Sequence, residues 1–378
     1  MNFACRRASI AVWTAVLLGI VSLAGRSALA QEKFSQLVGP VTVKPVQKSE
    51  VLQVPFITWG GDVATFHGNG GLTTKPDTIF AAHGLKLNLS NGDDFIGQVK
   101  DYLSGKTPFL RGTFRMLGQA SEVLGKDPKT KPVVVMQLSW SAGDHIVGRA
   151  DIKSLNDLKG KRIACQQGGP HVGLLYDSLD SAQLSKQDVT IVWTKDLTGP
   201  DGAAELFRKD ASVDACCVIT PDMLGLTGGF DSTGSGAEGT VKGARIVNST
   251  QTMNRSIADV YAVRKDWFDA NTDTVRKFVA GYLKATEEVV ALRKEFESTD
   301  KLSSSYRNLL TQSQQIFGQE VIPSIENDGH GLLLDCSFVG LPGQIAFFND
   351  AGNLNGFDAK LTKSLDLAMT WGYADRRF

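Results

Sequence analysis

The alternation of strand-like and helix-like segments between residues 151 and 219 is the strongest constraint on the fold of this chain. Apolar residues dominate 162–165, 189–193 and 213–219, as in buried strands, whereas helical segments end near Leu179 and span 203–208. Because parallel strands need a crossover connection, this order predicts a compact βαβαβ unit of under about a hundred residues. Such a unit is one lobe of a larger protein, since single cores stop growing well below 378 residues.

The first part of the chain shows a similar succession of elements. Strands are predicted at 54–59, which stops at Gly60-Gly61-Asp62, and at 85–89, which ends at Asn91-Gly92-Asp93-Asp94. Further strands are predicted at 133–138, 245–247 and 260–263, and helices at 95–103, 273–295, 306–317 and 357–371. The polar segment 31–50, which contains Pro and Lys, is expected to be a loose lead-in, and the Gly/Ser-rich segment 228–243 a loop.

The first thirty residues have the pattern of an export signal. Arg6 and Arg7 precede the uncharged apolar run 10–24, and Ala28-Leu29-Ala30 has the small-residue spacing that signal peptidase cleaves. The run is shorter than the roughly 20 residues that span a bilayer. We therefore expect residues 1–30 to be removed and the mature chain, from Gln31, to work in the periplasm without a membrane-embedded part. An uncleaved anchor is the alternative.

Charge and cysteine content narrow the classes of function. The 40 Lys+Arg residues balance the 40 Asp+Glu residues, so nucleic acid is not an expected partner. Gly234–Gly239 matches a dinucleotide-binding motif, but no strand precedes it closely and no helix follows. Neither a cofactor nor a metal site is predicted. Cys165, Cys216, Cys217 and Cys336 are expected to be buried thiols, although the sequence leaves a disulfide open.

Three segments resemble a known family in their order and spacing. Asp151–Ala164, Lys209–Ala215 and Ile257–Asp266, the last followed by the 273–295 helix, are similar to segments of type II periplasmic solute-binding proteins of ABC transporters. The nitrate/sulfonate/taurine-like and thiamine-precursor-like branches are the most similar. Lys209–Ala215 lacks the glycine of that family's G-x-x-D-A pattern. The resemblance covers residues 51–300.

The resemblance implies an α/β fold of two lobes, each a mixed sheet flanked by helices, with a ligand cleft between them. Lobe 1 would be discontinuous, residues 51–148 and 252–378, and lobe 2 would be inserted as residues 149–251. The implied function is that of an exported solute-binding protein of an ABC importer, which binds a small polar organic ligand by hinge closure. Its partners would be this small-molecule ligand and the ABC permease and ATPase subunits, and we expect a monomer without a cofactor.

Two other classes of function remain as alternatives. An enzyme on the same fold, a dehydratase or a Cys-dependent transferase or hydrolase, would need an acid, a base or a thiol in the cleft, for which His145 and Cys336 are the candidates. A sensory or scaffold module would lack a ligand-sized cleft. We expect the chain not to be an enzyme.

The candidate ligand-binding residues lie where such a fold brings strand ends and helix starts to the cleft. They are Thr58, Trp59, Gly60, Asp62, Asp94, Thr113, Arg115, Trp140, Ser141, Asp144, His145, Gln167, Gly168, Gly169, His171, Thr220, Asp222 and Asn254. Some have a purely structural alternative: Gly60 and Asp62 as part of a plain turn, Asp94 as a helix cap, and Arg115 as a surface arginine.

The charged residues of these loops indicate which ligand charge the site would accept. Asp62, Asp93, Asp94, Asp144 and Asp222 outnumber the basic side chains, which are Arg115 and the histidines. This balance does not favour a small oxyanion. A neutral or amine-bearing organic ligand fits the candidate residues as well as the sulfonate or nitrate of the similar proteins.

Overall fold

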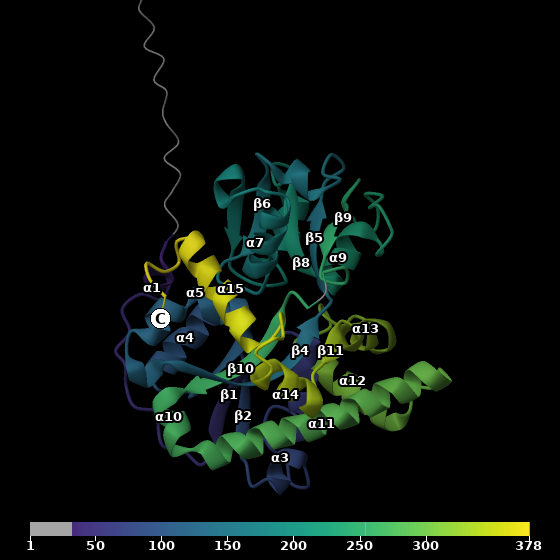
Figure 1. Ribbon diagram of the computed structural model, residues 1–378. Coiled ribbons are helices and arrows are strands. Elements are labelled where there is room, and N and C mark those ends of the chain that lie inside the picture. The colour runs from purple at the N-terminus through teal and green to yellow at the C-terminus, as the bar shows by residue number, and fades with distance from the viewer. Residues whose placement is uncertain (1–31, 254, 378) are drawn as a thin grey trace, which may run out of the picture. The chain divides into compact units, whose positions relative to one another are not determined.

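The computed structural model describes residues 32–253 and 255–377, so the predicted signal peptide and Asn254 lie outside the described residues. The described part contains three sheets of two, four and five strands, with helices packed around them (Figure 1). We call the part built on the two- and four-stranded sheets lobe 1, and the part built on the five-stranded sheet lobe 2.

The five-stranded sheet confirms the βαβαβ unit that the sequence predicts. Its strand order is β7-β6-β8-β5-β9, with β6 parallel to β7 and β8, and β5 antiparallel to β8 and β9. The strands are β5 Asp144–Gly148, β6 Arg162–Gln166, β7 Thr190–Thr194, β8 Ala215–Ile219 and β9 Arg245–Ser249. The helices are α7 His171–Ser181, α8 Ala203–Lys209 and α9 Thr220–Thr227. Strand β5 precedes the predicted lobe boundary after residue 148, yet it pairs only within this sheet in the described structure.

Lobe 1 contains a parallel pair, β1 and β2, and an antiparallel sheet in the order β11-β4-β10-β3. The strands are β1 Leu52–Phe56, β2 Leu87–Asn91, β3 Phe109–Thr113, β4 Pro132–Ser141, β10 Ala258–Arg264 and β11 Cys336–Phe338. The sequence analysis did not predict β3, β5 or β11. In β3 and β5, charged residues interrupt the apolar pattern, although all five positions of each strand are buried because tertiary partners satisfy those charges.

Helices cover the lobe-1 sheets, and most of the longer ones were predicted. They are α2 Val63–Asn69, α3 Ile79–Ala82, α4 Phe95–Leu103, α5 Phe114–Gln119, α6 Ser121–Gly125, α10 Lys265–Ala270, α11 Thr272–Thr299, α12 Ser304–Phe317, α13 His330–Leu334, α14 Leu341–Asn349 and α15 Phe357–Thr370. Single turns of 3-10 or π helix lie at Gly60–Asp62, Pro128–Thr130, Leu155–Leu158, Lys186–Asp188 and Ile325–Gly329.

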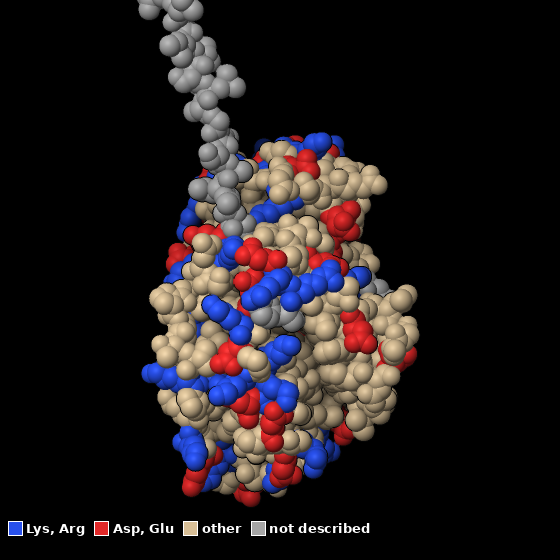
Figure 2. Space-filling model, turned by 60° about the vertical axis from the view of Figure 1, so that its left-hand side comes forward, with Lys and Arg blue, Asp and Glu red and all other residues tan. Residues whose placement is uncertain are grey.

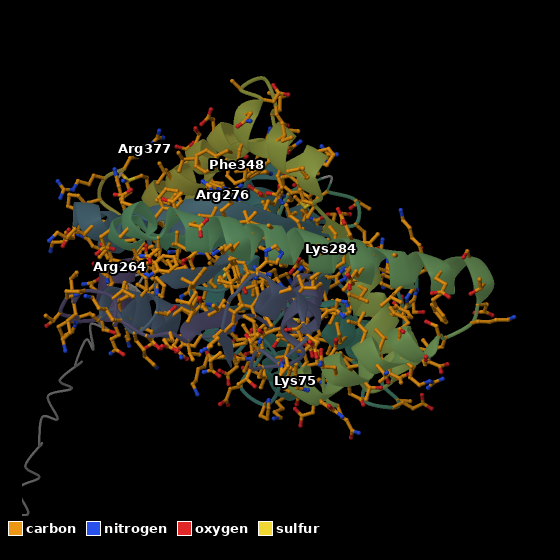
Figure 3. All side chains as sticks on the ribbon, turned by 90° about the horizontal axis from the view of Figure 1, so that it is seen from below. Lys75, Arg264, Arg276, Lys284, Phe348 and Arg377 are labelled. Carbon is orange, nitrogen blue, oxygen red and sulfur yellow. The ribbon has the colours of Figure 1, made fainter. Side chains whose placement is uncertain are left out.

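The long helix α11 shows how one apolar stripe fixes an element on a sheet. Val275, Phe278, Tyr282 and Val289 recur at helical spacing and are buried. Arg276 and Lys284 lie on the exposed side of the same helix (Figure 3). Burying side chains of this size stabilises the fold by about 1.5–3 kcal/mol each.

The lead-in segment packs more tightly than its polar composition predicts. It contains the short helix α1, Phe34–Val38, whose two terminal side chains are buried. The Phe34 ring meets the rings of Phe95 and Tyr373 edge-on, with centroids 6.0 and 6.3 Å apart. The N-terminal and C-terminal parts of the described chain therefore share one apolar core.

The surface agrees with the balanced charge of the sequence. Figure 2 shows basic and acidic side chains intermixed over one face. Among residues 32–253 and 255–377, we find no helix whose length and hydropathy would let it cross a membrane. All four described cysteines are buried free thiols, as predicted, and three of them lie in β6 and β8.

The chain crosses between the lobes twice. Only Ala142 and Gly143 separate β4 from β5, and residues 250–257 lead from β9 back to β10. Helix α7 of lobe 2 also packs against α5 and α15 of lobe 1, and their buried side chains form one continuous apolar cluster. The two short crossovers and the packing of α7 on α5 and α15 are among the connections that join the lobes.

Candidate ligand-binding site

A small cavity lies where strand ends from both lobes meet. It is lined by Ile57, Thr58, Trp59, Thr113, Ser141, Asp144, Pro170, Leu197, Ile219, Ile257 and Asp259. β1, β3, β4 and β8 end at or just before lining residues, and β5 begins at Asp144. The cavity volume is ≈ 10 Å³, about the space that one water molecule needs. The two lobes are therefore closed on each other.

The lobe-1 wall of the cavity rests on a buried network around Arg111. Arg111 Nη2 lies 2.7 Å from Asp62 Oδ2, and Nη1 lies 3.1 Å from Asp259 Oδ1. All three side chains are at most 3% exposed. Burial raises the pKa of Asp62 to about 6 and that of Asp259 to about 7, against the opposing effect of the Arg111 charge. One guanidinium is thus shared by two carboxyl groups.

Hydrogen bonds extend this network to the aromatic wall. Ser139 Oγ donates to Asp259 Oδ2 at 3.0 Å and accepts from Trp59 Nε1 at 3.2 Å. The next residue, Gly60, allows close approach of the chain: a Cβ there would overlap the carbonyl oxygen of Leu332. These contacts hold the Trp59 ring in place, and Trp59 is one of the residues that line the cavity.

A second polar cluster lies at the crossover between β4 and β5. Asp144 Oδ1 lies 2.8 Å from His171 Nε2, although the ring is not oriented for a hydrogen bond. Ser141 Oγ donates to the other Asp144 oxygen, and the Asp144 amide donates to Thr250 Oγ1 at 3.0 Å. Asp144 therefore connects lobe 2 with both crossovers.

His145 points away from this carboxylate. Its Nε2 lies 2.9 Å from Thr220 Oγ1, and burial lowers the pKa of His145 to about 4. The ring is consequently neutral at physiological pH. His145 and Thr220, both predicted ligand residues, bond to each other beside the cavity.

Asp335 reaches the same crossover from lobe 1, where its carbonyl oxygen accepts from the Ala142 amide. It is 5% exposed, and its Oδ2 has no hydrogen-bond partner among the described residues. Burial, together with the charge of Asp144, raises the pKa of Asp335 to about 7, against the lowering effect of the Thr220 hydroxyl. A Cβ at Gly143 would overlap this Oδ2. The crossover therefore packs directly on a carboxyl group.

Other contacts hold the lobes closed away from the cavity. Gln166 Nε2 of lobe 2 donates to the Asp93 carbonyl of lobe 1 at 3.0 Å. Arg115, on α5, forms an ion pair with Asp177 of α7, and its guanidinium lies 5.4 Å from the centroid of the Tyr176 ring. Arg115 is thus an interlobe contact and is not among the cavity-lining residues.

A family model described as NMT1/THI5 like matches residues 79–295, more than half of the chain. The chain belongs to the NMT1/THI5-like family. Among curated proteins, no sequence matches the chain. The family match is in line with the predicted resemblance, and solved structures of sulfonate- and nitrate-binding proteins share the fold.

Three solved structures illustrate the shared fold. The alkanesulfonate-binding protein SsuA of Xanthomonas axonopodis pv. citri is 15% identical, with a TM-score of 0.55 over 87% of this chain and 95% of its own. The periplasmic nitrate-binding protein NrtA of Synechocystis PCC 6803 is 12% identical, with a TM-score of 0.56 over 87% and 83%. The desulfurization enzyme DSZB is 14% identical, with a TM-score of 0.51 over 87% and 94%. At these identities the likeness shows the two-lobe α/β fold alone.

In this NMT1/THI5-like chain, the cavity brings together five of the predicted ligand residues. They are Thr58, Trp59, Thr113, Ser141 and Asp144. Asp62 supports the cavity from behind through Arg111, and His171 does so through Asp144. Thr113 lies in the last position of β3 and caps α5, so it occupies both a strand end and a helix start.

Other predicted residues lie elsewhere. Asp94 is exposed and caps α4 by accepting from the Gly97 amide at 2.9 Å. This helix cap is the structural role that the sequence offered as the alternative to ligand binding. Trp140 faces away from the cavity because neighbouring residues of β4 alternate between the two faces of the sheet. Its ring lies 5.0 Å from Lys360 Nζ and lines a separate groove. Asp222 lines a third groove beside Arg208.

The loop before α7 contributes to the surroundings of the cavity through its backbone more than through its side chains. Gln167 donates its amide to the Thr194 carbonyl at 3.0 Å. Gly168 has a φ of +73° and lies against Phe34 and Ile96, and a Cβ at Gly169 would overlap Gln166 Oε1. Pro170, the residue that follows them, is the part of this loop that lines the cavity.

The site also contains residues that the sequence analysis missed. Arg111 and Asp259 are the main ones, and each is a charged residue inside an apolar strand, β3 and β10. A charge in such a run requires a buried partner, and this signal was available in the sequence. The apolar lining residues Ile57, Leu197, Ile219 and Ile257 gave no comparable signal.

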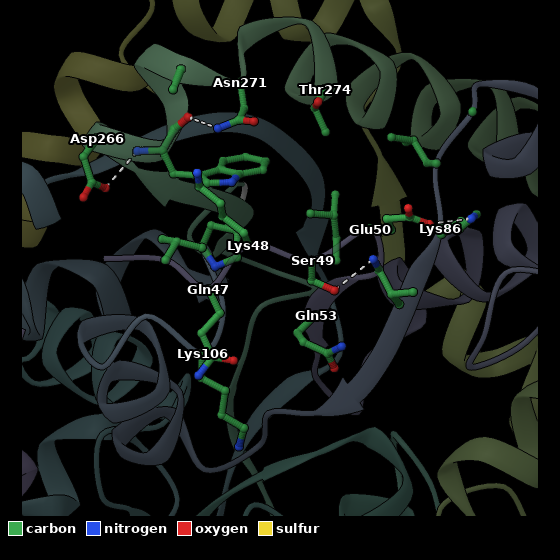
Figure 4. A pocket seen from close by; sticks show the side chains of 18 residues that line it. Gln47, Lys48, Ser49, Glu50, Gln53, Lys86, Lys106, Asp266, Asn271 and Thr274 are labelled. Carbon is green, nitrogen blue, oxygen red and sulfur yellow. Dashed lines mark hydrogen bonds and ion pairs between the residues drawn. The ribbon is translucent and has the colours of Figure 1, made fainter. Parts of the chain in front are cut away.

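A larger groove of ≈ 680 Å³ lies at the opposite ends of β1 and β2, between residues 46–53 and 266–274 (Figure 4). Most of its charged side chains are exposed, including Lys86, which pairs with Glu50 at the surface, whereas Asp266 is half-buried and pairs with Arg264. Open α/β sheets bind ligands at the carboxyl ends of their strands, and this groove lies at the amino ends. The interlobe cavity is therefore the better candidate. No group of potential metal ligands occurs in the described part of the chain.

Proposed function

We propose that the chain is an exported solute-binding protein of an ABC importer, which holds a small polar organic ligand between its lobes. The observation that carries this proposal is the cavity lined by both lobes and closed by Gln166, Arg115 and their partners. A ligand that touches both walls gains its full set of contacts only when the lobes are closed. Its binding therefore shifts the open–closed equilibrium.

The family and the leader support the rest of this proposal. Structures with the same fold are named as alkanesulfonate-binding and periplasmic nitrate-binding proteins. The pattern Ala28-Leu29-Ala30 supports cleavage and export to the periplasm. An ABC permease with its ATPase would receive the ligand from the closed protein, which would act as a monomer. The hinge would run through the two crossovers, at residues 142–143 and 250–257.

The enzyme DSZB shares the fold, which makes an enzymatic function the second candidate. A Cys-dependent mechanism is poorly supported, because Cys336 lies in an apolar cluster with Ile57 and Ile322, and burial raises the pKa of its thiol. His330 bonds to the Tyr306 hydroxyl at 2.8 Å instead of activating this thiol. The enzymatic candidate would gain support if the protein converted a bound ligand and Asp144→Asn stopped turnover without stopping binding.

A comparison of two tryptophans tests the binding function. Trp59 lines the cavity, whereas Trp267 lines the groove at the far ends of β1 and β2. The mature protein is screened by thermal shift against amines, sulfonates, phosphonates and pyrimidines, and closure is followed by small-angle scattering. We expect one class to raise the Tm and Trp59→Ala to abolish this shift, while Trp267→Ala retains it. Equal loss in both folded variants, or no shift with any class, would contradict the proposal.

A further inference from the structure

We propose that the ligand is a small organic cation, with the carboxylates of Asp144 and Asp259 as counter-ions and the Trp59 ring as one wall of its site. This inference rests on the proposed function, because it names the ligand class of the same cavity. It differs from the ligands named for the similar structures, which are an alkanesulfonate and nitrate.

The lining of the cavity has one sign of charge. Asp144 and Asp259 are 3% and 2% exposed and come from different lobes. Three hydroxyl groups, those of Thr58, Thr113 and Ser141, complete the polar lining, and none of the lining residues is a lysine, arginine or histidine. A nitrate or sulfonate held here would face two carboxylates without a basic side chain among the lining residues. Desolvation would strengthen this repulsion.

The buried Arg111 does not make the net charge beside the cavity positive. Arg111 is fully buried behind the wall, and its guanidinium is already shared by Asp62 and Asp259. One positive charge against two carboxylates leaves the group with an excess negative charge when both are ionised. A cation placed against Asp259 would balance this excess, whereas an anion would increase it.

The groups behind Asp144 leave it able to accept a further charged donor. Its Oδ1 lies near His171, whose ring is not oriented for a hydrogen bond and whose Nδ1 has no partner among the described residues. The second counter-ion is therefore held in place by Ser141 and the crossover, without a strong basic partner of its own.

The remaining lining residues suit an alkylated cation. Ser139 fixes the Trp59 ring, and ring faces attract cations that have lost their water. Ile57, Leu197, Ile219 and Ile257 give the cavity apolar walls. Because the present volume of ≈ 10 Å³ holds no organic molecule, the lobes must lie further apart around the ligand than they do here.

The pH dependence of binding distinguishes a cationic ligand from an anionic one. Asp259 is faced by Arg111 of β3, Asp62 of the turn after β1, Asp144 of β5 and the Cys336 thiol, and burial raises its pKa to about 7. Below this pKa the carboxyl group is neutral, and above it the group is a carboxylate. Affinity for a cation should therefore rise as pH rises through about 7, and affinity for an oxyanion should fall.

The test uses three probes of similar size: choline, its uncharged isostere 3,3-dimethylbutan-1-ol, and ethanesulfonate. Thermal shift and calorimetry of the mature protein are run at about pH 6 and about pH 8, with each probe at up to about 10 mM. The variant is Asp144→Asn, which keeps the shape of the side chain but removes its charge. The control is Asp94→Asn, which removes a carboxylate from the exposed cap of α4.

We expect choline to raise the Tm, more at the higher pH, and the uncharged isostere to give no comparable shift. Asp144→Asn should weaken choline binding by about tenfold or more, with Asp94→Asn unchanged. If ethanesulfonate binds and choline does not, or if the isostere binds as tightly as choline, the cation assignment is wrong while the binding function stands. If none of the three probes binds, the assignment is overturned and the screen with the two tryptophan variants decides the function itself.

Discussion

The two polar clusters beside the cavity differ in how completely their members are paired. Around Arg111, each charged group meets an opposite charge, at distances of 2.7 and 3.1 Å. Around Asp144 and Asp335, both carboxyl groups are buried, and Oδ2 of Asp335 has no partner among the described residues. The first cluster lies within lobe 1, and the second lies at the crossover between the lobes.

This difference indicates different roles for the two clusters. A buried network in which one guanidinium contacts both carboxyl groups holds its side chains in one arrangement, and breaking it is costly, even though Asp259 can still take up a proton near pH 7. An incompletely paired cluster is sensitive to protonation and to a new partner. We therefore infer that the Arg111 network is the fixed wall of the site and that the crossover cluster is the part that responds.

The largest effect on the free energy of unfolding is expected when the Arg111 network is broken. Arg111→Met would leave Asp62 and Asp259 buried without their common counter-ion, and should lower the free energy of unfolding by about 3–5 kcal/mol. Urea unfolding at neutral pH measures this loss. Lys86→Met, which breaks the exposed pair with Glu50, is the control and should cost less than about 1 kcal/mol. Similar losses in the two variants would show that the network does not hold the wall.

A smaller effect on the free energy of unfolding, of opposite sign, is expected in the incompletely paired cluster around Asp144 and Asp335. The pKa of Asp335 is raised in the folded protein from 3.8 to about 7. Its contribution to stability is therefore full below about pH 4 and is lost as pH rises through about 7, because the buried group must then ionise. Asp335→Asn removes this loss, and should raise the free energy of unfolding by about 1–3 kcal/mol near pH 8 but not near pH 4.

Unfolding curves of the wild type and Asp335→Asn across this pH range provide the measurement. The difference between the two proteins should grow with pH. A constant difference would mean that Asp335 does not titrate within the closed crossover, and the contrast with the Arg111 network would then lose its basis.

The smallest effect is expected at Asp94, which belongs to neither cluster. Asp94→Ala removes the side chain that accepts from the Gly97 amide at 2.9 Å, and should cost about 1 kcal/mol of stability. Ligand binding should not change, because the side chain caps α4 and is not among the residues that line the cavity. A loss of affinity larger than the loss of stability explains would return Asp94 to the ligand site.

Much of the fold could be predicted because its signals are local. The alternation around β6, α7, β7, α8 and β8 is visible in short windows of sequence, and so is the stripe of α11. The strands β3 and β5 were missed because Arg111 and Asp144 interrupt or begin apolar runs. Their burial depends on partners far away in the chain.

The candidate site was predicted in part. Strand ends such as Thr58, Trp59 and Ser141 line the cavity, since the position of a strand end is a local property. Arg115 and Asp222 were placed at the cleft by analogy of position alone, and their side chains turn to α7 and to a separate groove. The direction of a side chain depends on what packs around it.

The sequence by itself determined the α/β class, the βαβαβ unit and the acidic character of the candidate loops. Only the tertiary structure decided which charges meet: Arg111 joins Asp62 and Asp259 across 49 and 148 positions of the chain. Periodicity is carried by residues a few positions apart, so it can be read locally. The pairing of buried charges depends on how distant segments come together, and this arrangement placed Asp259 at the cavity, with Arg111 and Asp62 behind it.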